Sequence, residues 1–504
     1  MDRTRSVGSL CILILAILCC AAAPAGKRDL VVLQAADVQK FDPHMSTSEP
    51  DTKITFNIFD NLVMRDDDLQ VKPALATEWK RLNNTTWEFK IRPGIKFHNG
   101  EPLTAETVRF SLSRTLPSGD PAIITRTTFT TFDRVEVADP STVRIITKAP
   151  DPFVLDRLAM YGGQIIPKQY FEKVGAAEFN AKPVGTGPLK LLEWVKDDHS
   201  HFEVVKDWWG GKLDFDKVTF RPVPEPAARI AALLKGEADI IVKLPPDDVD
   251  RVNKSANAKV AGVFYSGFYV LNSNYERPFP MNSKLVHQAL SLAIDRQAIV
   301  NDLWRGQGIV PNGVYPKGNM AYDQSLPPLP YDPAKAKGLL KQAGYKNEEI
   351  VLESTDGYMA NAKQMGEAIV TMWKDIGVNA KLEIIEYSVR AQKYRSRSFK
   401  GFFWTDPTDI FNDPAGQVWR LAGPGAPSAY LKISEWENIM QQAVVTFDAA
   451  KRRQMYLEAQ RLFMEYLMWI PVIQPVESYG VQKFIDWKPR GNQILRVEKV
   501  KFVR

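Results

Sequence analysis

The sequence predicts an α/β protein with two or three domains. Its 504 residues exceed the roughly 250–300 residues at which a single hydrophobic core stops growing. Segments with helical periodicity alternate with short apolar runs, which is the pattern of α/β lobes. With 45% hydrophobic and 25% charged residues, the composition is that of a globular protein. The net charge of +6 comes without a basic run, so we expect no nucleic-acid binding.

Residues 1–25 predict a secretory signal peptide. The start at residues 3–5 is basic, residues 10–20 are apolar, and residues 23–25 are small enough for cleavage. The alternative is an uncleaved membrane anchor, but the apolar run is short for a hydrocarbon core of ~30 Å. We therefore expect a secreted mature chain, which in a Gram-negative bacterium would be periplasmic.

The cysteines lie only in this leader, at Cys11, Cys19 and Cys20. A mature chain without cysteine has no disulfide, no thiol nucleophile and no thiolate metal ligand. Lipidation of Cys19 or Cys20 is the alternative to cleavage after Ala25. A lipidated cysteine normally follows a small residue, and Leu18 and Cys19 stand there instead, so we favour cleavage after Ala25.

The mature chain begins with the run LVVLQ at residues 30–34, which predicts a buried strand. A loop at residues 41–48 follows, and then a helical pattern through Ile54, Ile58 and Leu62. The residues of the loop alone favour a surface connection.

The stretch from residue 74 to residue 114 has the clearest local pattern. Residues 86–91 alternate between apolar and polar, which predicts a strand with one buried face, and residues 95–97 predict a second short strand after Pro93-Gly94. Thr104 is a predicted N-cap of a helix that continues to Arg114. Residues 135–147 predict two paired strands around Asp139-Pro140.

The remaining elements alternate between helix and strand. We predict helices at 227–236, 285–300 (capped by Ser283), 332–344, 365–376, 434–446 and 448–466, and strands or extended segments at 237–240, 264–272, 380–385 and 469–473. The glycines of Val184-Gly185-Thr186-Gly187 lack the spacing of a phosphate-binding loop and predict a tight entry into a strand.

Four segments together resemble family 5 extracellular solute-binding proteins, the peptide, dipeptide and nickel receptors of ABC importers. They are W-x-F-K-I-R-P-G-I-K-F-H-N-G-x-P-L-T-A-E-T-V at residues 87–108, VGTGPLKL at 184–191, LVHQALSLAIDRQAIV at 285–300 and YDPAKAKGLLKQAGY at 331–345. The family usually has arginine where His287 stands, so we expect a structural role for this histidine.

The resemblance implies a two-lobed periplasmic binding protein fold (type II, large peptide-binding class) with an additional inserted domain. We assign 1–25 to the signal peptide, 26–61, 183–267 and 476–504 to lobe I, 62–182 to the inserted domain and 268–475 to lobe II. Two adjacent crossing strands between the lobes would make a hinge that can close on ligand.

The resemblance also implies the site. The loop with Met45 and Thr47 would border the cleft, and the segment from Gly401 to Pro414 is similar to the family's W-x-x-D-x-x-D-P. In peptide-binding members an aspartate of this segment pairs with the ligand's α-ammonium, and Asp409 aligns best, ahead of Asp406. Trp404 would supply a flat apolar wall. The alternatives are a turn rich in Asp and Pro and a tryptophan in the core.

Asp356 occupies the place at which dipeptide receptors carry an arginine for the ligand's carboxylate. Because an aspartate cannot bind a carboxylate, the ligand would be longer, blocked at its C-terminus or cationic. Opines, cationic amines and metal chelates therefore stand beside di- and oligopeptides as expected ligands, and the resemblance to the family adds oligosaccharides.

No enzymatic motif is present in the sequence, which lacks a G-x-S-x-G elbow, an H-E-x-x-H helix and a Walker motif. A secreted glycoside hydrolase is the enzymatic alternative, because the chain has enough carboxylates, 59 Asp and Glu in all, to supply a catalytic pair. His199 and His201 have a spacing that suits a metal, but no third ligand is evident, and we expect solvated side chains.

We therefore expect no enzyme, no metal and no cofactor. The predicted function is that of a monomeric periplasmic receptor that binds a small solute or peptide and delivers it to the membrane subunits of an ABC permease. A sensor coupled to a chemoreceptor would share the fold.

Overall fold

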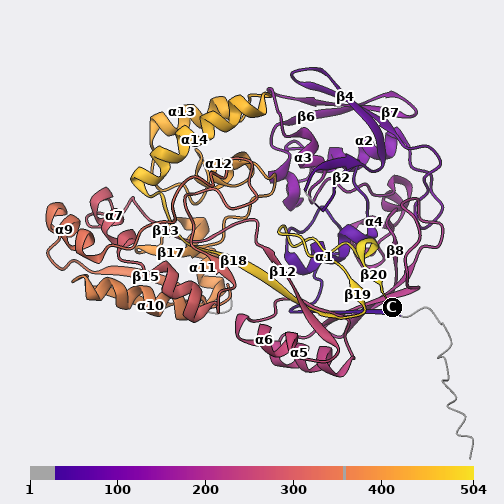
Figure 1. Ribbon diagram of the computed structural model, residues 1–504. Coiled ribbons are helices and arrows are strands. Elements are labelled where there is room, and N and C mark those ends of the chain that lie inside the picture. Colours follow the sequence, from indigo (N-terminus) through magenta and orange to yellow (C-terminus); the bar gives the residue numbers. More distant parts are fainter. Residues whose placement is uncertain (1–28, 68, 356–358, 504) are drawn as a thin grey trace, which may run out of the picture.

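The computed structural model describes residues 29–67, 69–355 and 359–503. It shows two α/β lobes side by side, joined by the long strand β18 (Trp469–Gln482) (Figure 1). One mixed sheet runs through both lobes in the order β16-β15-β17-β13-β18-β11-β1-β10-β9-β8. Among the described residues, none of the helices is long and apolar enough to cross a membrane. The predicted signal peptide lies outside the described residues.

Lobe I is built on two parallel strands, β1 (Leu30–Gln34) and β10 (Lys217–Pro222). The sheet continues with β9 (His199–Val204) and β8 (Leu189–Val195) on one side and with β11 (Ile240–Ile241) on the other. The helices of this lobe are α1 (Glu49–Ile58), α4 (Lys168–Ala181), α5 (Pro226–Lys235) and α6 (Val249–Asn253).

Strand β1 is apolar on both faces because helices cover both faces of the sheet. Leu30 and Val32 pack with residues of α1 and α4, whereas Leu33 packs with residues of α5 and α6. Successive side chains of a strand point to opposite faces, so a strand covered on both sides has no polar alternation. This explains the uninterrupted run LVVLQ.

A second body of structure follows α1 in the chain and lies at the upper right of Figure 1. Its antiparallel sheet has the order β4 (Ala76–Asn83), β5 (Thr86–Ile91), β7 (Thr142–Thr147) and β6 (Phe132–Asp139). The hairpin β2 (Val63–Arg65) and β3 (Val71–Pro73) and the helices α2 (Ala105–Arg114) and α3 (Val154–Leu158) complete it. One apolar cluster, from Leu62 to Ile165, forms its core.

Lobe II contains the strands β13 (Tyr269–Ser273), β17 (Phe402–Thr405), β15 (Ile350–Ser354) and β16 (Ala380–Ile384). The helices on this sheet are α7 (Lys284–Leu292), α9 (Pro333–Ala343), α10 (Ala362–Asp375) and α11 (Tyr387–Ser396). A further layer consists of α12 (Val418–Ala422), α13 (Ser434–Ala443) and α14 (Ala449–Tyr466). Strands β15 and β16 are parallel and are connected through α10, which is the α/β pattern that the sequence predicts.

The chain passes between the lobes along two neighbouring paths. Residues 469–473 of β18 pair with β13 in lobe II, and residues 476–482 pair with β12 (Ala258–Phe264) in lobe I. Because β12 and β13 are consecutive in the chain, both crossings lie side by side, as predicted. The short strand β14 (Gly308–Ile309) also pairs with β18 there. The residue ranges that we assign to each domain stay a prediction.

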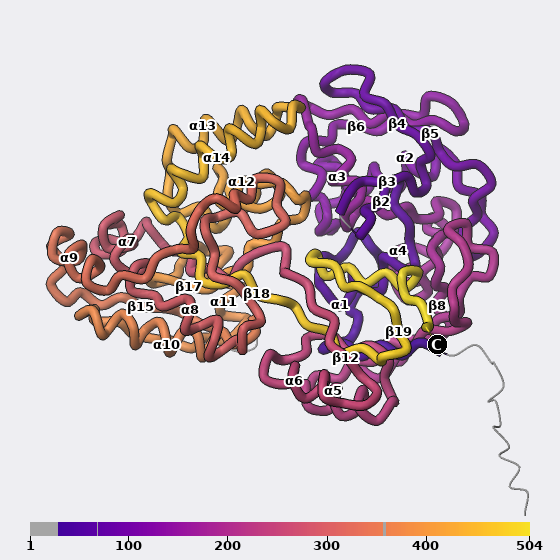
Figure 2. Tube along the Cα trace, in the orientation of Figure 1, coloured from indigo at the N-terminus to yellow at the C-terminus, as the bar shows by residue number. Residues whose placement is uncertain are grey.

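The C-terminal tail returns to lobe I, as Figure 2 shows for the yellow segment near α1. Asn57 of α1 anchors it, because its side chain donates to the carbonyl oxygen of Leu495 (2.8 Å) and accepts from the amide of Val497 (2.9 Å). The short strands β19 (Ile485–Asp486) and β20 (Lys501–Phe502) pair at the end of this tail.

The predicted helix signals are largely confirmed. The Thr104 hydroxyl accepts from the amide of Thr107 (3.2 Å), and the Asp332 carboxylate accepts from the amide of Lys335 (2.8 Å). Pro333 is the first residue of α9, and Gly344 ends the helix in the left-handed region with φ 76°. Gly185 is required for another reason, since a Cβ there would lie 1.9 Å from the carbonyl oxygen of Ile58.

Three predicted elements are wrong in extent. Residues 285–300 are not one helix, because α7 ends at Leu292 and Asp295 caps the separate short helix α8 (Arg296–Ala298). The buried Arg296 takes up the carbonyl oxygens of Ser291 and Ile294, which would otherwise accept helical hydrogen bonds. Residues 95–97 form only an isolated bridge between Lys96 and Pro102. The strand predicted at 469–473 continues to Gln482, because it pairs with strands of both lobes.

His287 has a structural environment, as the sequence predicts. Its ring is fully buried, and Nε2 lies 2.9 Å from the carbonyl oxygen of Met281 and 3.1 Å from the Ser273 hydroxyl. Burial lowers the pKa of His287 to about 3, so the ring is neutral and acts as a polar packing element.

Candidate ligand-binding site

A cavity of about 330 Å³ lies between the lobes. Its lobe I wall contains Thr47, Glu49 and Thr52, and the body that carries α3 adds Met160 and Tyr161. The lobe II wall contains Arg390, Tyr394, residues 405–410, Arg420 and Leu421, and the C-terminal tail adds Asn492, Gln493 and Ile494. This volume is at the low end of the range of small-molecule sites, about 300–1,000 Å³. The cavity therefore suits a small polar ligand.

The lobe I wall is formed by the first turn of α1. Glu49 lies there, and its carboxylate contacts the ammonium groups of both Lys53 and Lys243, the latter at 2.7 Å. Burial by itself would raise the pKa of Glu49, but the two lysines outweigh it and hold the pKa at about 2. The negative charge of Glu49 is thus permanent and already balanced by the protein.

The lobe II wall begins where strand β17 ends. Asp406 follows this strand, is half-buried and lines the cavity. Thr408, two residues further on, bonds to the Tyr265 hydroxyl and forms a bridge with Gly267, which fixes the segment against the crossing region. The backbone thus presents the Asp406 carboxylate at the junction of the lobes.

Asp409 lines the same cavity, but its carboxylate is occupied by the protein. One oxygen accepts from the amides of Phe411 (3.0 Å) and Asp413 (3.2 Å), and the other accepts from the Asn319 side chain (2.6 Å). The residue is 4% exposed, and burial raises its pKa to about 7 against the effect of these donors. Asp409 thus braces the loop, and the half-buried Asp406 is more accessible to a ligand in the cavity.

Two arginines that sequence reasoning missed line the lobe II wall. Arg390 lies on α11 and donates to the carbonyl oxygen of Trp404 (3.3 Å). Arg420 lies on α12 and donates to the carbonyl oxygens of Gly416 and Thr408, each at 2.9 Å. Since α11 has no buried residue, its sequence lacks the apolar periodicity that would have drawn attention to Arg390.

The other predicted site residues are distributed as follows. Thr47 lines the cavity, whereas Met45, in the same loop, is half-buried and does not line it. Trp404 is 1% exposed and packs in the core of lobe II, which fits the alternative of a core tryptophan. Asp356 lies outside the described residues. Thr47, Asp406 and Asp409 are thus the predicted residues that the fold brings together.

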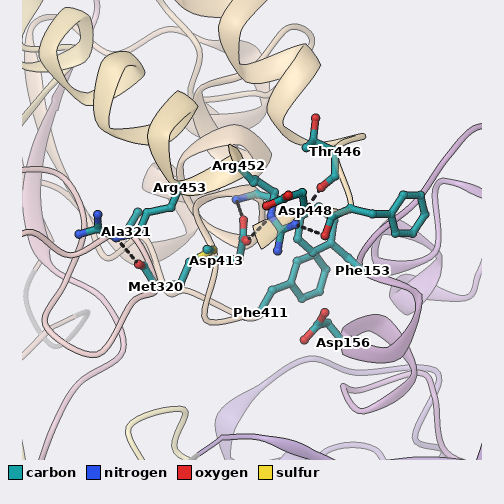
Figure 3. A network of polar contacts seen from close by, with 12 residues as sticks. Phe153, Asp156, Met320, Ala321, Phe411, Asp413, Thr446, Asp448, Arg452 and Arg453 are labelled. Carbon is teal, nitrogen blue, oxygen red and sulfur yellow. Dashed lines mark hydrogen bonds and ion pairs between the residues drawn. The ribbon is translucent and has the colours of Figure 1, made fainter. Parts of the chain in front are cut away.

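Next to the cavity the second lobe contacts the body that carries α3. Figure 3 shows Phe153 and Asp156 on one side and Phe411, Asp413 and Arg452 on the other. The rings of Phe153 and Phe411 are stacked, with centroids 5.6 Å apart. Arg452 pairs with Asp413 at 2.9 Å and lies over the ring of Phe153. The contact places a small apolar cluster at the mouth between the lobes.

A hydrogen bond completes this contact. Arg65 pairs with Asp156 and donates through the same nitrogen to the carbonyl oxygen of Phe411 (3.0 Å). Burial raises the pKa of Asp156 to about 6, although Arg65 acts against this effect. Lobe II and the body that carries α3 are therefore held together by stacking, an arginine and buried carboxylates.

Two α/β lobes, joined by adjacent crossing strands and enclosing a charged cavity, define a two-lobed binding protein. Residues 70–428 match the family of bacterial extracellular solute-binding proteins, family 5 Middle. The chain belongs to this family, as the sequence motifs predict.

Similar proteins agree in length and fold. The chain is 28% identical over 471 residues to the glutathione-binding protein GsiB of Salmonella typhimurium (strain LT2), with 90% of each chain covered. It is 26% identical to di/tripeptide-binding protein 2 of Pseudomonas aeruginosa (strain UCBPP-PA14), with 94% of each chain covered. The periplasmic binding protein DppA from Helicobacter pylori, solved with the peptide STSA, has a TM-score of 0.83 at 24% identity and covers 95% of this chain and 98% of its own. The two-lobed fold is thereby shown.

Proposed function

We propose that this protein is the periplasmic substrate-binding component of an ABC importer and that it binds a small peptide by closure of its two lobes. Membership of the solute-binding family and the similarity to glutathione- and di/tripeptide-binding proteins support this function. The protein would release its ligand unchanged to the permease subunits, act as a monomer and reach the periplasm through its signal peptide.

The observation that carries the proposal is the pair of opposite charges on the lobe II wall. Asp406 and the arginines Arg390 and Arg420 line one cavity. A free peptide carries an α-ammonium and a carboxylate, so Asp406 would bind the first and an arginine the second. Hydrogen bonds between ionised partners are stronger than neutral ones, and arginine can bind a carboxylate through two parallel bonds.

The two arginines remove one reason to expect a cationic or blocked ligand. The sequence places Asp356 where dipeptide receptors carry an arginine, and none of the predicted site residues is cationic. Arg390 or Arg420 can fill that role from α11 or α12. A free carboxylate on the ligand is therefore compatible with the cavity.

A glutathione-like tripeptide is the second candidate within this class. Glutathione has one ammonium and two carboxylates, and the lobe II wall offers one half-buried aspartate and two arginines. Glu49 would not repel the second carboxylate strongly, because Lys53 and Lys243 balance its charge. Opines also carry both charges, and a solved relative of similar fold was determined with agropinic acid, at 24% identity.

Closure would take place about the two crossing segments. The connection between β12 and β13 and the middle of β18 lie side by side, which allows a rotation without breaking either half-sheet. Ligand that contacts both walls favours the closed state by its difference in affinity for the two states. The contact of Phe153 with Phe411 would then form or tighten.

Calorimetric titration and thermal unfolding of the mature protein test the proposal. The ligands are a dipeptide, a tripeptide, glutathione, the tripeptide with an acetylated N-terminus or an amidated C-terminus, and an opine. Ligand at a hundredfold its dissociation constant adds about 2.7 kcal/mol and should raise Tm by a few degrees. Mass spectrometry of the recovered ligand should show no conversion.

The panel distinguishes the alternatives. Tight binding of the free tripeptide that both blocking groups weaken supports the peptide function. A clear preference for glutathione over neutral tripeptides would show that the site also binds the second carboxylate of glutathione. Binding of opines alone, or hydrolysis of a peptide or glycoside, would contradict the proposal.

A further inference from the structure

We propose that the β8–β9 hairpin of lobe I binds a divalent transition-metal ion, Zn²⁺ in the first place, through Glu193, His199 and His201. The site is separate from the ligand cavity, because none of these residues lines it. It lies at the edge of the sheet farthest from lobe II, where β8 ends the strand order (Figure 1).

Strand geometry brings the three side chains together. His199 and His201 are two residues apart on β9, so they point to the same face of the sheet. Glu193 on β8 is the register partner of His201. The potential ligand atoms of the three residues all lie within 4.8 Å of one another, and Nε2 of His199 is 3.4 Å from the Glu193 carboxylate.

A bulge in β8 sets this alignment. Leu191 pairs with Phe202 and Glu193 pairs with His201, so one residue of β8 is unmatched between them. A bulge of this kind redirects the side chains that follow it. The sequence shows the two histidines, but it cannot show that a glutamate six residues upstream faces them.

Both imidazoles have a second partner that would orient them for a metal. Nδ1 of His199 is 2.9 Å from the Asp198 carboxylate, and Nδ1 of His201 is 2.8 Å from the Thr219 hydroxyl. Thr219 lies on β10 as the register partner of His201, so three adjacent strands contribute to the site. Histidines that bind metals almost always bond through their other nitrogen, which fixes the ring.

The donor set indicates the ion. Two imidazoles and one carboxylate are typical of zinc sites with an open fourth position for water, whereas calcium and magnesium prefer oxygen ligands alone. The ligands of a tetrahedral zinc ion are about 3.3–3.6 Å apart, given bond lengths of about 2.0–2.2 Å. The imidazole centroids are 4.0 Å apart, and both rings are only half-buried, so small rotations close the remaining gap.

An ordinary surface cluster is the competing explanation. His199 would then serve as a hydrogen-bond partner of Asp198 and Glu193, and His201 would be a separate residue bonded to Thr219. This explanation accounts for each contact but not for the convergence of all three groups on one point. A metal ion would join β8 to β9 and stabilise the exposed edge of lobe I.

Titration of the mature, tag-free and chelator-treated protein with ZnCl₂ tests the site. We expect one saturable equivalent for the wild type. We expect at least tenfold weaker binding for His199→Ala and His201→Ala, and no measurable binding for the double variant. Glu203→Gln is the matched control, because Glu203 lies two residues further along β9 and pairs with Lys190 instead. This control should bind zinc as the wild type does.

Thermal unfolding with and without zinc supplies a second measurement. Zinc should raise Tm of the wild type and of Glu203→Gln, but not of the double variant, and all proteins should bind the same peptide equally well. Zinc binding that survives in the double variant, an equal response to Mg²⁺, or no saturable binding at all would overturn the proposal.

Discussion

The two walls of the cavity carry charge in different ways. On the lobe I wall, Glu49 is balanced by Lys53 and Lys243 within the protein. On the lobe II wall, Arg420 is exposed and donates to the backbone carbonyl oxygens of Gly416 and Thr408, which carry no formal charge. A charged ligand therefore gains more from lobe II than from lobe I. We infer that lobe II recognises the ligand and that lobe I closes over it.

Asp406→Asn should have the largest effect on affinity. Asparagine keeps the shape of the side chain but removes the charge that would bind an α-ammonium. Loss of one partner of a buried charge pair costs about 2–4 kcal/mol, or roughly 30- to 1,000-fold in Kd. Calorimetric titration with the free tripeptide measures it.

The N-acetylated tripeptide is the control for Asp406. It should bind the wild type weakly, and the substitution should weaken it little further, because the ammonium is absent in both experiments. If Asp406→Asn weakens both ligands equally, Asp406 does not meet the ammonium.

Arg420→Gln should have a smaller effect. Arg420 is exposed at the rim of the cavity, so solvent screens its interaction with a ligand carboxylate. We expect a loss of about 1–2 kcal/mol, or roughly 5- to 30-fold, in titrations with the free tripeptide. The C-amidated tripeptide should be insensitive to the substitution, and equal losses with both tripeptides would rule out contact of Arg420 with the carboxylate. Arg390→Gln tests the other arginine in the same way.

Phe411→Leu tests closure, and its effect should be smaller still. Phe411 of lobe II stacks on Phe153 of the body that carries α3, and such a pair contributes about 0.5–1.5 kcal/mol beyond its buried area. Affinity should fall by about 2- to 10-fold, and small-angle scattering should show a more open protein. Phe399→Leu is the matched control, because Phe399 stacks on Phe403 within lobe II. It should lower Tm but leave affinity unchanged.

Glu49→Gln should change stability and leave affinity almost unchanged. Lys53 is 1% exposed and would lose its partner, and breaking a buried pair typically costs 3–5 kcal/mol. We expect about 2–3 kcal/mol, because the buried Glu477 still interacts with Lys53. Urea unfolding measures the loss. A large loss of affinity with normal stability would show that lobe I, and not lobe II, recognises the ligand.

The sequence predicts those parts of the protein that depend on local pattern. The caps at Thr104 and Asp332, the paired strands around Asp139 and the double crossing are all present. Interactions between distant segments were not predictable. Asp409 is occupied by Asn319, ninety residues away, and Arg296 interrupts a helix by bonding to Pro471 in β18.

For the same reason, only part of the site is predictable from the sequence. The resemblance led to the segment that carries Asp406 and Asp409, but the choice between them depends on how deeply the fold buries each carboxylate. Trp404 has the residue type of a ligand wall, and only packing shows that it belongs to the core. Arg390 and Glu193 lie next to the other residues of their sites because the chain turns back on itself. Such turns leave no periodic pattern in the sequence.

His44 should affect stability but not affinity. It lies in the loop that the sequence assigns to the surface, yet its ring is fully buried in lobe I. Nε2 is 2.9 Å from the carbonyl oxygen of Gln164, and Nδ1 accepts from Arg114 at 2.9 Å. Burial and the Arg114 charge lower its pKa to about 4, so the ring is neutral when folded.

Since the unfolded chain binds this proton near pH 6.5 and the folded chain near pH 4, the contribution of His44 to stability is complete above pH 6.5 and is lost as the pH falls towards 4. His44→Gln can keep both hydrogen bonds without the titration. The free energy of unfolding of the wild type relative to this variant should therefore fall by about 2 kcal/mol between pH 7.5 and pH 5. Urea unfolding at both values measures the change. If the difference in unfolding free energy between the two proteins does not change with pH, folding does not shift the pKa of His44. The ring would then be protonated inside lobe I at pH 5.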